Sequence, residues 1–380
     1  MAPSFPLTKG VSAAVPIAIC AAACIGSFPH LAQATEILFQ DTQVQATFPQ
    51  VGGSPTWLLE AVVVRADDNQ RHPLAAFIDG TPETSPRPML YVAKELARRG
   101  WTTVAVMRPG FGTSQGKEPP DTCSGDFVTL ANFSSQTLRE TIRFMTPMAY
   151  IDPSRSIVVG HSSGGVGAVA TTVNPPANLV AGINFDGVIG SQYENGKVDT
   201  VCKSADLIKA FASFGARSRI PMLWIYAQND PYMGPTAAQQ YYQAFTGAGG
   251  KADFEMAPAT PAGTDGHMLY SMPDEVPVWT PYLDKFFATQ KLALISPPLS
   301  VTYPVVSPPA GLSASGQTGF ASYLTQMPHK AFAMSSSHWG SAWLDDSTAT
   351  ATQKALANCT AVTAASDPCK VVNIDDQPSQ

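Results

Sequence analysis

The 380-residue sequence is poor in charged side chains, which make up 14% of it, and its 23 lysines and arginines are outnumbered by 29 aspartates and glutamates. No basic stripe is present, which argues against nucleic acid as a partner. No two of the six cysteines have C-x-x-C spacing and no histidine lies close to one in sequence, so we expect no metal site. After the first 34 residues the sequence also lacks an apolar run long enough to span a membrane, so we expect no stable membrane insertion.

Proline (33) and glycine (29) are abundant instead, a composition that suits a loop-rich exported protein. At the N-terminus, Lys9 precedes the apolar stretch 11–26, and residues 32–34 (A-Q-A) have the small-x-small pattern of a signal-peptidase site. We therefore expect residues 1–34 to be a signal peptide, cleaved near Ala34, and the mature chain to be secreted or periplasmic. A lipoprotein site at Cys24 is the alternative, although the usual leucine three positions earlier is missing.

Four cysteines would remain after that cleavage, and an even number in an oxidising compartment predicts two disulfides. Sequence alone allows three ways to pair them. Cys359 and Cys369 enclose a short polar loop, and we expect them to pair locally. That leaves Cys123 to pair with Cys202, which would join two loops of the larger domain.

Apolar strands and amphipathic helices alternate along most of the chain. The expected strands are 57–67, 74–80, 101–110, 155–162, 177–187, 220–230 and 251–258, and the expected helices are 87–100, 126–146, 204–215, 236–247 and 276–290. This alternation predicts an α/β fold, with a mostly parallel central sheet and helices on both faces, in a domain of residues 35–294. Such sheets carry their reactive groups at the carboxyl ends of the strands.

Ser162 stands at one of these strand ends, within the sequence G-H-S-S-G of residues 160–164. The G-x-S-x-G pattern between a strand and a helix is typical of a nucleophile elbow, where glycines two places to either side let neighbouring backbone pass closely. The helix beginning at Ser163 would direct its free N–H groups to the same point. The alternative is a glycine-rich turn of no chemical importance.

A serine nucleophile needs a base, and the base needs an orienting acid, in the chain order serine, acid, histidine. His267 follows the last expected strand in a glycine-rich loop, where the base is expected. Asp230 ends a buried strand and is the expected acid, while Asp186, at the end of the preceding strand, is the alternative acid. A surface-loop histidine and turn-forming aspartates are the ordinary explanations of such residues.

An oxyanion hole would need two main-chain N–H groups. Ser163 offers one, and Thr81, after the glycine of an I-D-G-T turn, is the expected second donor; a plain β-turn is the alternative. The loop 107–116 should wall the same cleft, with Arg108 in a structural ion pair. The stretch 190–207 is expected to form a lid or pocket wall.

Together these motifs resemble the α/β-hydrolase superfamily: G-H-S-S-G-G after an apolar strand, D-G-T, R-P-G-F-G-T-S, N-D-P, and D-G-H before a tryptophan-containing helix. The resemblance covers about residues 55–291 and is nearest to the dienelactone-hydrolase-like and secreted serine esterase branch. It implies Ser162 as nucleophile, His267 as base and Asp230 as acid. Asp79 departs from the family pattern, since many relatives have histidine there, and its carboxylate would disfavour an oxyanion unless it points away.

The resemblance implies a secreted serine hydrolase that cleaves small-molecule carboxylic esters through an acyl-enzyme and needs no cofactor. Because dienelactone hydrolases proper use cysteine as nucleophile, the serine favours an esterase. One alternative is a serine peptidase or acyltransferase with the same triad, since the triad fixes acyl transfer and leaves the acceptor open. Another is a non-catalytic binding protein of this fold.

The composition changes after residue 294. Residues 295–316 hold five prolines and are expected to be a semi-rigid linker. Residues 317–380 should form a small α+β module that contains cysteine, with strands at 330–335, 340–345 and 369–375 and a helix at 347–359. His338 beside Trp339 makes this module a candidate for binding another surface or partner; a tryptophan in the core of a tiny domain is the alternative.

Overall fold

The structure is a computed structural model that describes residues 34–80, 84–119, 123, 126–191 and 201–379. Several sequence-based expectations lie outside these ranges: the expected signal peptide up to residue 33, the lipoprotein alternative at Cys24, the oxyanion donor Thr81 and residues 192–200 of the expected lid. Within the described ranges, no helix is long and apolar enough to cross a membrane.

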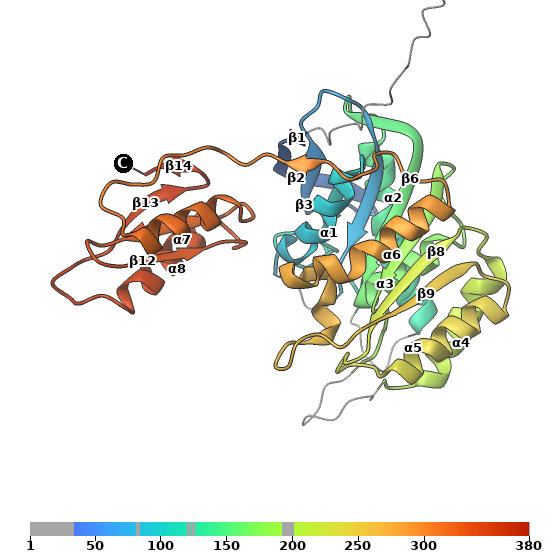
Figure 1. Cartoon of the computed structure of the whole chain (residues 1–380). Helices are drawn as coiled ribbons and strands as arrows, with labels where there is room; N and C mark the ends of the chain where they lie inside the picture. Colours follow the sequence, from blue (N-terminus) through green and yellow to red (C-terminus); the bar gives the residue numbers. More distant parts are fainter. Residues whose placement is uncertain (1–33, 81–83, 120–122, 124–125, 192–200, 380) are drawn as a thin grey trace, which may run out of the picture. The chain divides into compact units, whose positions relative to one another are not determined.

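An eight-stranded sheet forms the centre of the larger part of the chain (Figure 1). Its order is β2-β3-β5-β4-β6-β7-β8-β9; β3 pairs antiparallel with both its neighbours, and all other pairs are parallel. The strands are β2 Ile37–Thr47, β3 Thr56–Ala66, β4 His72–Ile78, β5 Thr102–Val106, β6 Ile151–His161, β7 Leu179–Phe185, β8 Met222–Ala227 and β9 Ala252–Ala257. The predicted mostly parallel α/β sheet is confirmed.

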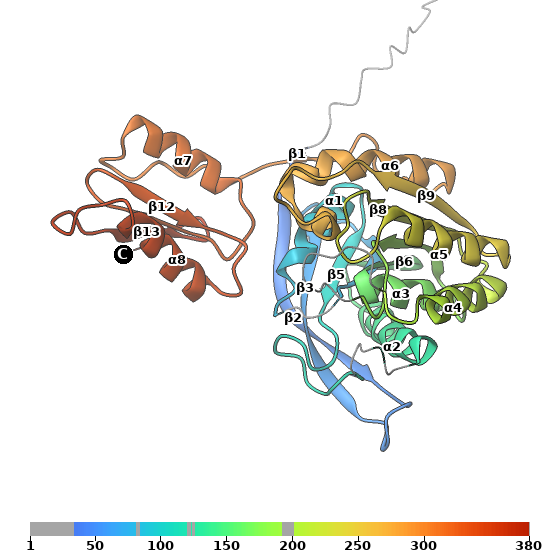
Figure 2. The same ribbon diagram turned by 90° about the horizontal axis from the view of Figure 1, so that it is seen from below.

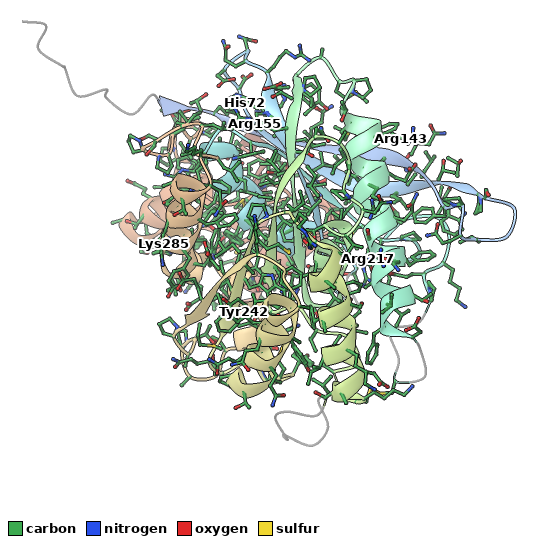
Figure 3. All side chains as sticks on the ribbon, turned by 90° about the vertical axis from the view of Figure 1, so that its right-hand side faces the viewer. His72, Arg143, Arg155, Arg217, Tyr242 and Lys285 are labelled. Carbon is green, nitrogen blue, oxygen red and sulfur yellow. A yellow bond between two sulfur atoms is a disulfide. The ribbon has the colours of Figure 1, made fainter. Side chains whose placement is uncertain are left out.

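Helices cover both faces of the sheet (Figures 1 and 2). They are α1 Leu90–Arg98, α2 Phe127–Met145, α3 Ser162–Thr171, α4 Ser204–Arg217, α5 Pro235–Gly247 and α6 Val276–Thr289. Helices α1 and α6 contribute to one hydrophobic cluster, and α2 to α5 contribute to two clusters on the opposite face. Figure 3 shows this division through two labelled side chains, Lys285 on α6 and Arg143 on α2, which lie on opposite sides.

Strand β8 shows how the sequence forms these two faces. Leu223 and Ile225 pack in the cluster with α1 and α6, while Trp224 and Tyr226 pack in the cluster with α4 and α5. All four are buried. Because successive side chains of a strand point to opposite faces, a strand covered on both sides needs an unbroken apolar run, and this pattern is what predicted β6, β7 and β8.

Strand β2, an element of 11 residues, was not predicted by the sequence pattern. It pairs with β3 along its whole length, from Ile37 opposite Ala66 to Thr47 opposite Thr56. Its sequence, I-L-F-Q-D-T-Q-V-Q-A-T, is rich in polar residues, and many of its side chains are exposed or half-buried. Main-chain pairing at the sheet edge therefore holds β2 in place, a long-range contact that local hydrophobicity does not report.

The C-terminal part has a small antiparallel sheet of its own in the order β12-β11-β13-β14, with two helices. The elements are α7 Ala314–Leu324, β11 Ala331–Met334, β12 Trp339–Ala342, α8 Thr348–Thr360, β13 Lys370–Ile374 and β14 Gln377–Pro378. The small α+β module is present, with α7 and β14 in addition to the expected elements. Helix α7 begins inside the expected linker, and the boundaries 295–316 and 317–380 stay predictions.

Trp339 is half-buried and packs against a hydrophobic cluster of this module. Its ring stacks on Phe332, with centroids 5.4 Å apart, and a Cβ added at Gly319 would meet its six-membered ring. The packing agrees with the alternative of a core tryptophan.

Both expected disulfides are formed. Cys123 is bonded to Cys202 across 79 residues, and Cys359 is bonded to Cys369 across 10 residues. The first joins the segment before α2 to the segment before α4, and the second joins the end of α8 to the start of β13. The first bond therefore links segments far apart in the sequence, and the second closes a short local loop.

Candidate active site

Ser162 follows β6 directly and is the first residue of α3, at the carboxyl end of the sheet. Its φ of +52° lies in the left-handed region, which residues with a side chain rarely adopt. Such strain persists only where the surroundings fix it, and it gathers at functional sites. The turn thus has the sharp strand-to-helix geometry expected of a nucleophile elbow.

Close backbone contacts explain the glycines around this turn. A Cβ at Gly164 would lie 2.6 Å from the main-chain oxygen of Asp79 and 2.7 Å from that of Ile78. A Cβ at Gly160 would overlap the Gly164 carbonyl, and one at Gly80 would overlap the side chain of Ser162. Helix α3 therefore starts directly against the ends of β4 and β6, and Gly80 brings the loop after β4 onto Ser162.

His267 and Asp230 form a buried pair at the same end of the sheet. His267 lies in a short 3-10 helix, η2 Gly266–Ser271, and its Nδ1 donates to Asp230 Oδ2 at 2.6 Å. The other oxygen of Asp230 accepts main-chain N–H bonds from Tyr232 and Met233, at 2.7 and 3.3 Å. With Nδ1 engaged by the carboxylate, Nε2 of His267 is the nitrogen left to accept a proton.

The residue next to Ser162 contacts His267 directly. His161 Nε2 lies 2.8 Å from the main-chain oxygen of His267, and the two ring centroids are 4.5 Å apart. The Tyr232 ring lies 4.6 Å from the His267 ring. The structure thus brings β6, the turn after β8 and η2 together around the imidazole.

Asp186, the alternative acid, is also in this site but is not the partner of His267. It follows β7, has φ +44° and is fully buried. One of its oxygens accepts the Ala227 N–H at 3.0 Å, and the other, Oδ2, has no hydrogen-bond partner among the described residues. Burial, and then the nearby Asp230 carboxylate, raise the pKa of Asp186 well above its ordinary value.

Asp186, Asp230 and His267 also have the residue types of a metal site. Their ligand atoms lie within 4.8 Å of one another, and in the described part of the chain no other group of this kind is found. The direct Asp230–His267 hydrogen bond already explains the proximity of two of them.

The structure describes one of the two expected oxyanion donors. Ser163 is buried in the first turn of α3. Thr81 lies outside the described residues. The N–H of Gly80 is engaged by the Asp79 carboxylate at 2.6 Å, and its carbonyl accepts from Arg108 at 2.6 Å, so both main-chain groups of this glycine are held.

Arg108 also pairs with a carboxylate, as expected. Its Nη1 lies 2.6 Å from Glu118 Oε2, and both side chains are buried. Glu118 Oε1 accepts from Ser134 on α2 at 2.8 Å. This chain of contacts supports the loop after β4 from behind, which is a structural role.

The structure answers the question raised by Asp79, whose carboxylate turns into the protein. Asp79 Oδ1 lies 2.6 Å from His161 Nδ1, and Oδ2 accepts from the Tyr270 hydroxyl. Burial alone would raise the pKa of Asp79, but the charge and hydrogen bonds of His161, with those of Tyr270 and Gly80, outweigh it and leave the pKa below its ordinary value.

Sequence reasoning did not assign a role to His161 or Tyr270. His161 was present only as the second letter of the nucleophile motif, and Tyr270 is three residues after the expected base. The departure at Asp79 was the one available signal. Its meaning depends on a contact across 82 residues, which the sequence pattern does not show.

The chain belongs to the alpha/beta hydrolase family, whose model matches residues 80–364. Among solved structures it is similar to an esterase from Pyrococcus furiosus (13% identity, TM-score 0.46, 68% of this chain and 97% of that one). It is also similar to a predicted dienelactone hydrolase from Klebsiella pneumoniae (13%, 0.44, 67% and 98%) and to esterase Est1E from Butyrivibrio proteoclasticus with ferulic acid bound (16%, 0.46, 62% and 96%). No curated protein gave a match.

Proposed function

We propose that this chain is a serine hydrolase that cleaves carboxylic esters, with Ser162 as nucleophile, His267 as base and Asp230 as acid. The main-chain N–H groups of Ser163 and Thr81 form its oxyanion hole. The observation that carries the proposal is the 2.6 Å hydrogen bond from His267 Nδ1 to Asp230, at the sheet end that also holds the strained turn of Ser162.

In the proposed reaction, Nε2 of His267 takes the hydroxyl proton as Ser162 Oγ attacks the ester carbonyl carbon. The carbonyl oxygen becomes an anion, which the two N–H groups stabilise. When the tetrahedral centre collapses, the C–O bond to the alcohol breaks and His267 returns its proton to the leaving oxygen. Water then repeats the sequence on the acyl-serine, releasing the carboxylic acid and the free enzyme.

The neighbourhood of Asp230 supports its part in this scheme. Two main-chain N–H bonds and the imidazole hold its charge in place. The raised pKa of Asp186 favours its uncharged form, which would add no second negative charge beside the imidazolium that forms in the reaction. Asp230 therefore has the charge and orientation that the proposed role needs.

A peptidase or acyltransferase would use the same residues, because they determine acyl transfer and not the acceptor.

We also propose that the chain is exported. Two disulfides fit an oxidising compartment, and a signal peptide ending near Ala34 would direct the chain there. Mass spectrometry of the N-terminal peptide of the protein exported by a bacterial host would identify the mature N-terminus, or a lipid-modified Cys24 if the lipoprotein alternative holds.

A substrate panel tests the proposed activity. Mature chain and a Ser162→Ala control are assayed on p-nitrophenyl esters of increasing acyl length, on peptide anilides, and on an ester with an added alcohol acceptor. Release of p-nitrophenol by the wild-type chain alone supports the esterase. Faster turnover of the anilides indicates a peptidase, and a new ester of the added alcohol indicates an acyltransferase. Equal turnover by the alanine variant contradicts any role of Ser162.

A further inference from the structure

We propose that Asp79 and His161 are a positioning pair, which fixes the main chain of the catalytic histidine and turns the acid of the oxyanion loop away from the nucleophile. This inference rests on the proposed function and adds two residues to its machinery. Neither residue touches the reacting atoms. Both act through the groups that do.

The His161 ring bridges two segments that carry proposed functional groups. Its Nδ1 lies 2.6 Å from Asp79 Oδ1, and its Nε2 lies 2.8 Å from the carbonyl oxygen of His267. The His267 carbonyl can only accept, so Nε2 carries a proton and donates to it, while Nδ1 and Asp79 Oδ1 share a second proton; Asp79 is the counter-charge of the ring when that proton lies on Nδ1. Burial lowers the pKa of His161, and the Asp79 carboxylate opposes that effect without outweighing it.

Asp79 completes the connection on the oxyanion side. Its Oδ1 also accepts the N–H of Gly80, the glycine that lies against Ser162. Its Oδ2 accepts from Tyr270, whose ring stacks on His161 with centroids 4.1 Å apart. Four contacts therefore link the end of β4, the end of β6 and η2.

Burying this cluster costs more free energy than filling the same space with apolar side chains. Asp79 and His161 are 3% and 2% exposed, and burying two ionisable groups is unfavourable unless each is paired and hydrogen-bonded. Apolar residues of similar size would stabilise the fold at least as well. They could not hold a carbonyl oxygen of η2, however, and a displacement of about 1 Å in a catalytic group can cost about 100-fold in rate.

Two variants at one position separate the two contacts. The amide nitrogen of asparagine can replace Nδ1 of histidine, and that of glutamine can replace Nε2. His161→Asn therefore keeps a donor for Asp79 and loses the one for the His267 carbonyl. His161→Gln does the reverse. Both remove the ring and its charge, so each is the matched control of the other.

The readout is the second-order rate at which a fluorophosphonate labels Ser162, which requires no knowledge of the natural ester. We expect His161→Asn to slow labelling by about 10- to 100-fold and His161→Gln by no more than a few-fold. On any p-nitrophenyl ester that the wild-type chain cleaves, the loss should fall on kcat and leave KM nearly unchanged. Thermal unfolding is measured for both variants.

Equal labelling rates in the two variants overturn the positioning role, whatever their thermal stabilities. If His161→Asn does not fold, Asp79→Asn decides: it leaves the ring in place without its counter-charge, and we expect labelling to fall by about tenfold. Unchanged labelling in that variant also overturns the proposal. A wild-type chain that is not labelled at all contradicts the proposed function itself, so the two failures are distinguishable.

Discussion

Two aspartates, Asp230 and Asp186, were candidates for the acid that serves His267. The sequence placed Asp230 and Asp186 at the ends of consecutive sheet strands and could not measure the distance from either to the histidine. The structure gives the Nδ1 hydrogen bond to Asp230, and burial raises the pKa of Asp186. The hydrogen bonds to Asp230 therefore favour it as the acid, while burial favours the uncharged form of Asp186.

We predict that Asp230→Asn lowers kcat/KM by about 10³- to 10⁴-fold, since the amide cannot stabilise the imidazolium. Asp186→Asn should cost less than tenfold, because asparagine resembles a protonated aspartate in shape and hydrogen bonding. Steady-state kinetics of both variants on one p-nitrophenyl ester compare them directly. The reverse ranking would make Asp186 the acid.

Asp186 also predicts a pH dependence of stability. Its pKa is higher in the folded than in the unfolded chain, so the folded chain binds more protons between the ordinary aspartate range near pH ~4 and the raised value. Its contribution to stability is present at low pH and is lost as the pH rises through that window. The difference in Tm between Asp186→Asn and wild type should therefore increase with pH. A difference that stays constant from pH 4 to 8 contradicts a raised pKa.

Continuous apolar runs and helical apolar spacing predicted the central strands and their helices. Helix α2, for example, lies within the expected range 126–146, and the structure adds its N-cap, Asp126, whose side chain accepts from the N–H groups of Val128 and Thr129. The pattern failed where tertiary contacts decide. Polar β2 is held by β3, and α7 has so many glycines and serines that its sequence is typical of a linker. The orientation of Asp79 was unpredictable for the same reason.

The turn between β6 and α3 can be tested through its glycines. Gly164→Ala places a Cβ against two main-chain carbonyls and should destabilise the fold by about 1–3 kcal/mol, with loss of turnover. Gly247→Ala is the control, because a Cβ there meets nothing within 4 Å. It should be neutral or stabilise by a few tenths of a kcal/mol. Urea unfolding of both variants measures the difference, and equal stabilities would contradict the close packing of this turn.

Two long-range features of the whole molecule position the site. The parallel sheet brings the reactive groups to one end, and the disulfides hold distant segments together. The loops that would complete a substrate pocket include residues outside the described ranges. The Cys123–Cys202 disulfide joins the segment before α2 to the segment before α4, and both segments adjoin such residues. The disulfide that closes the longer loop of chain is thus expected to stabilise the fold and to help fix the shape of the pocket.

We predict that replacing Cys123 and Cys202 with serine lowers the free energy of unfolding by about 4–5 kcal/mol, from the chain entropy of a loop of this length. The same change at Cys359 and Cys369 should cost about 3 kcal/mol or less, because the loop is shorter. Denaturant unfolding of the two double variants compares them. A larger loss for the short loop would show that the entropic explanation is wrong here.

The most direct measurement is to map where a fluorophosphonate attaches to the mature chain, by mass spectrometry of its peptides. A hydroxyl made reactive by an imidazole and its carboxylate partner should yield one adduct, on the peptide that contains residue 162. The adduct should disappear in Ser162→Ala and form at least ~10³-fold more slowly in His267→Gln. Attachment elsewhere, or undiminished attachment without the imidazole, would contradict the account.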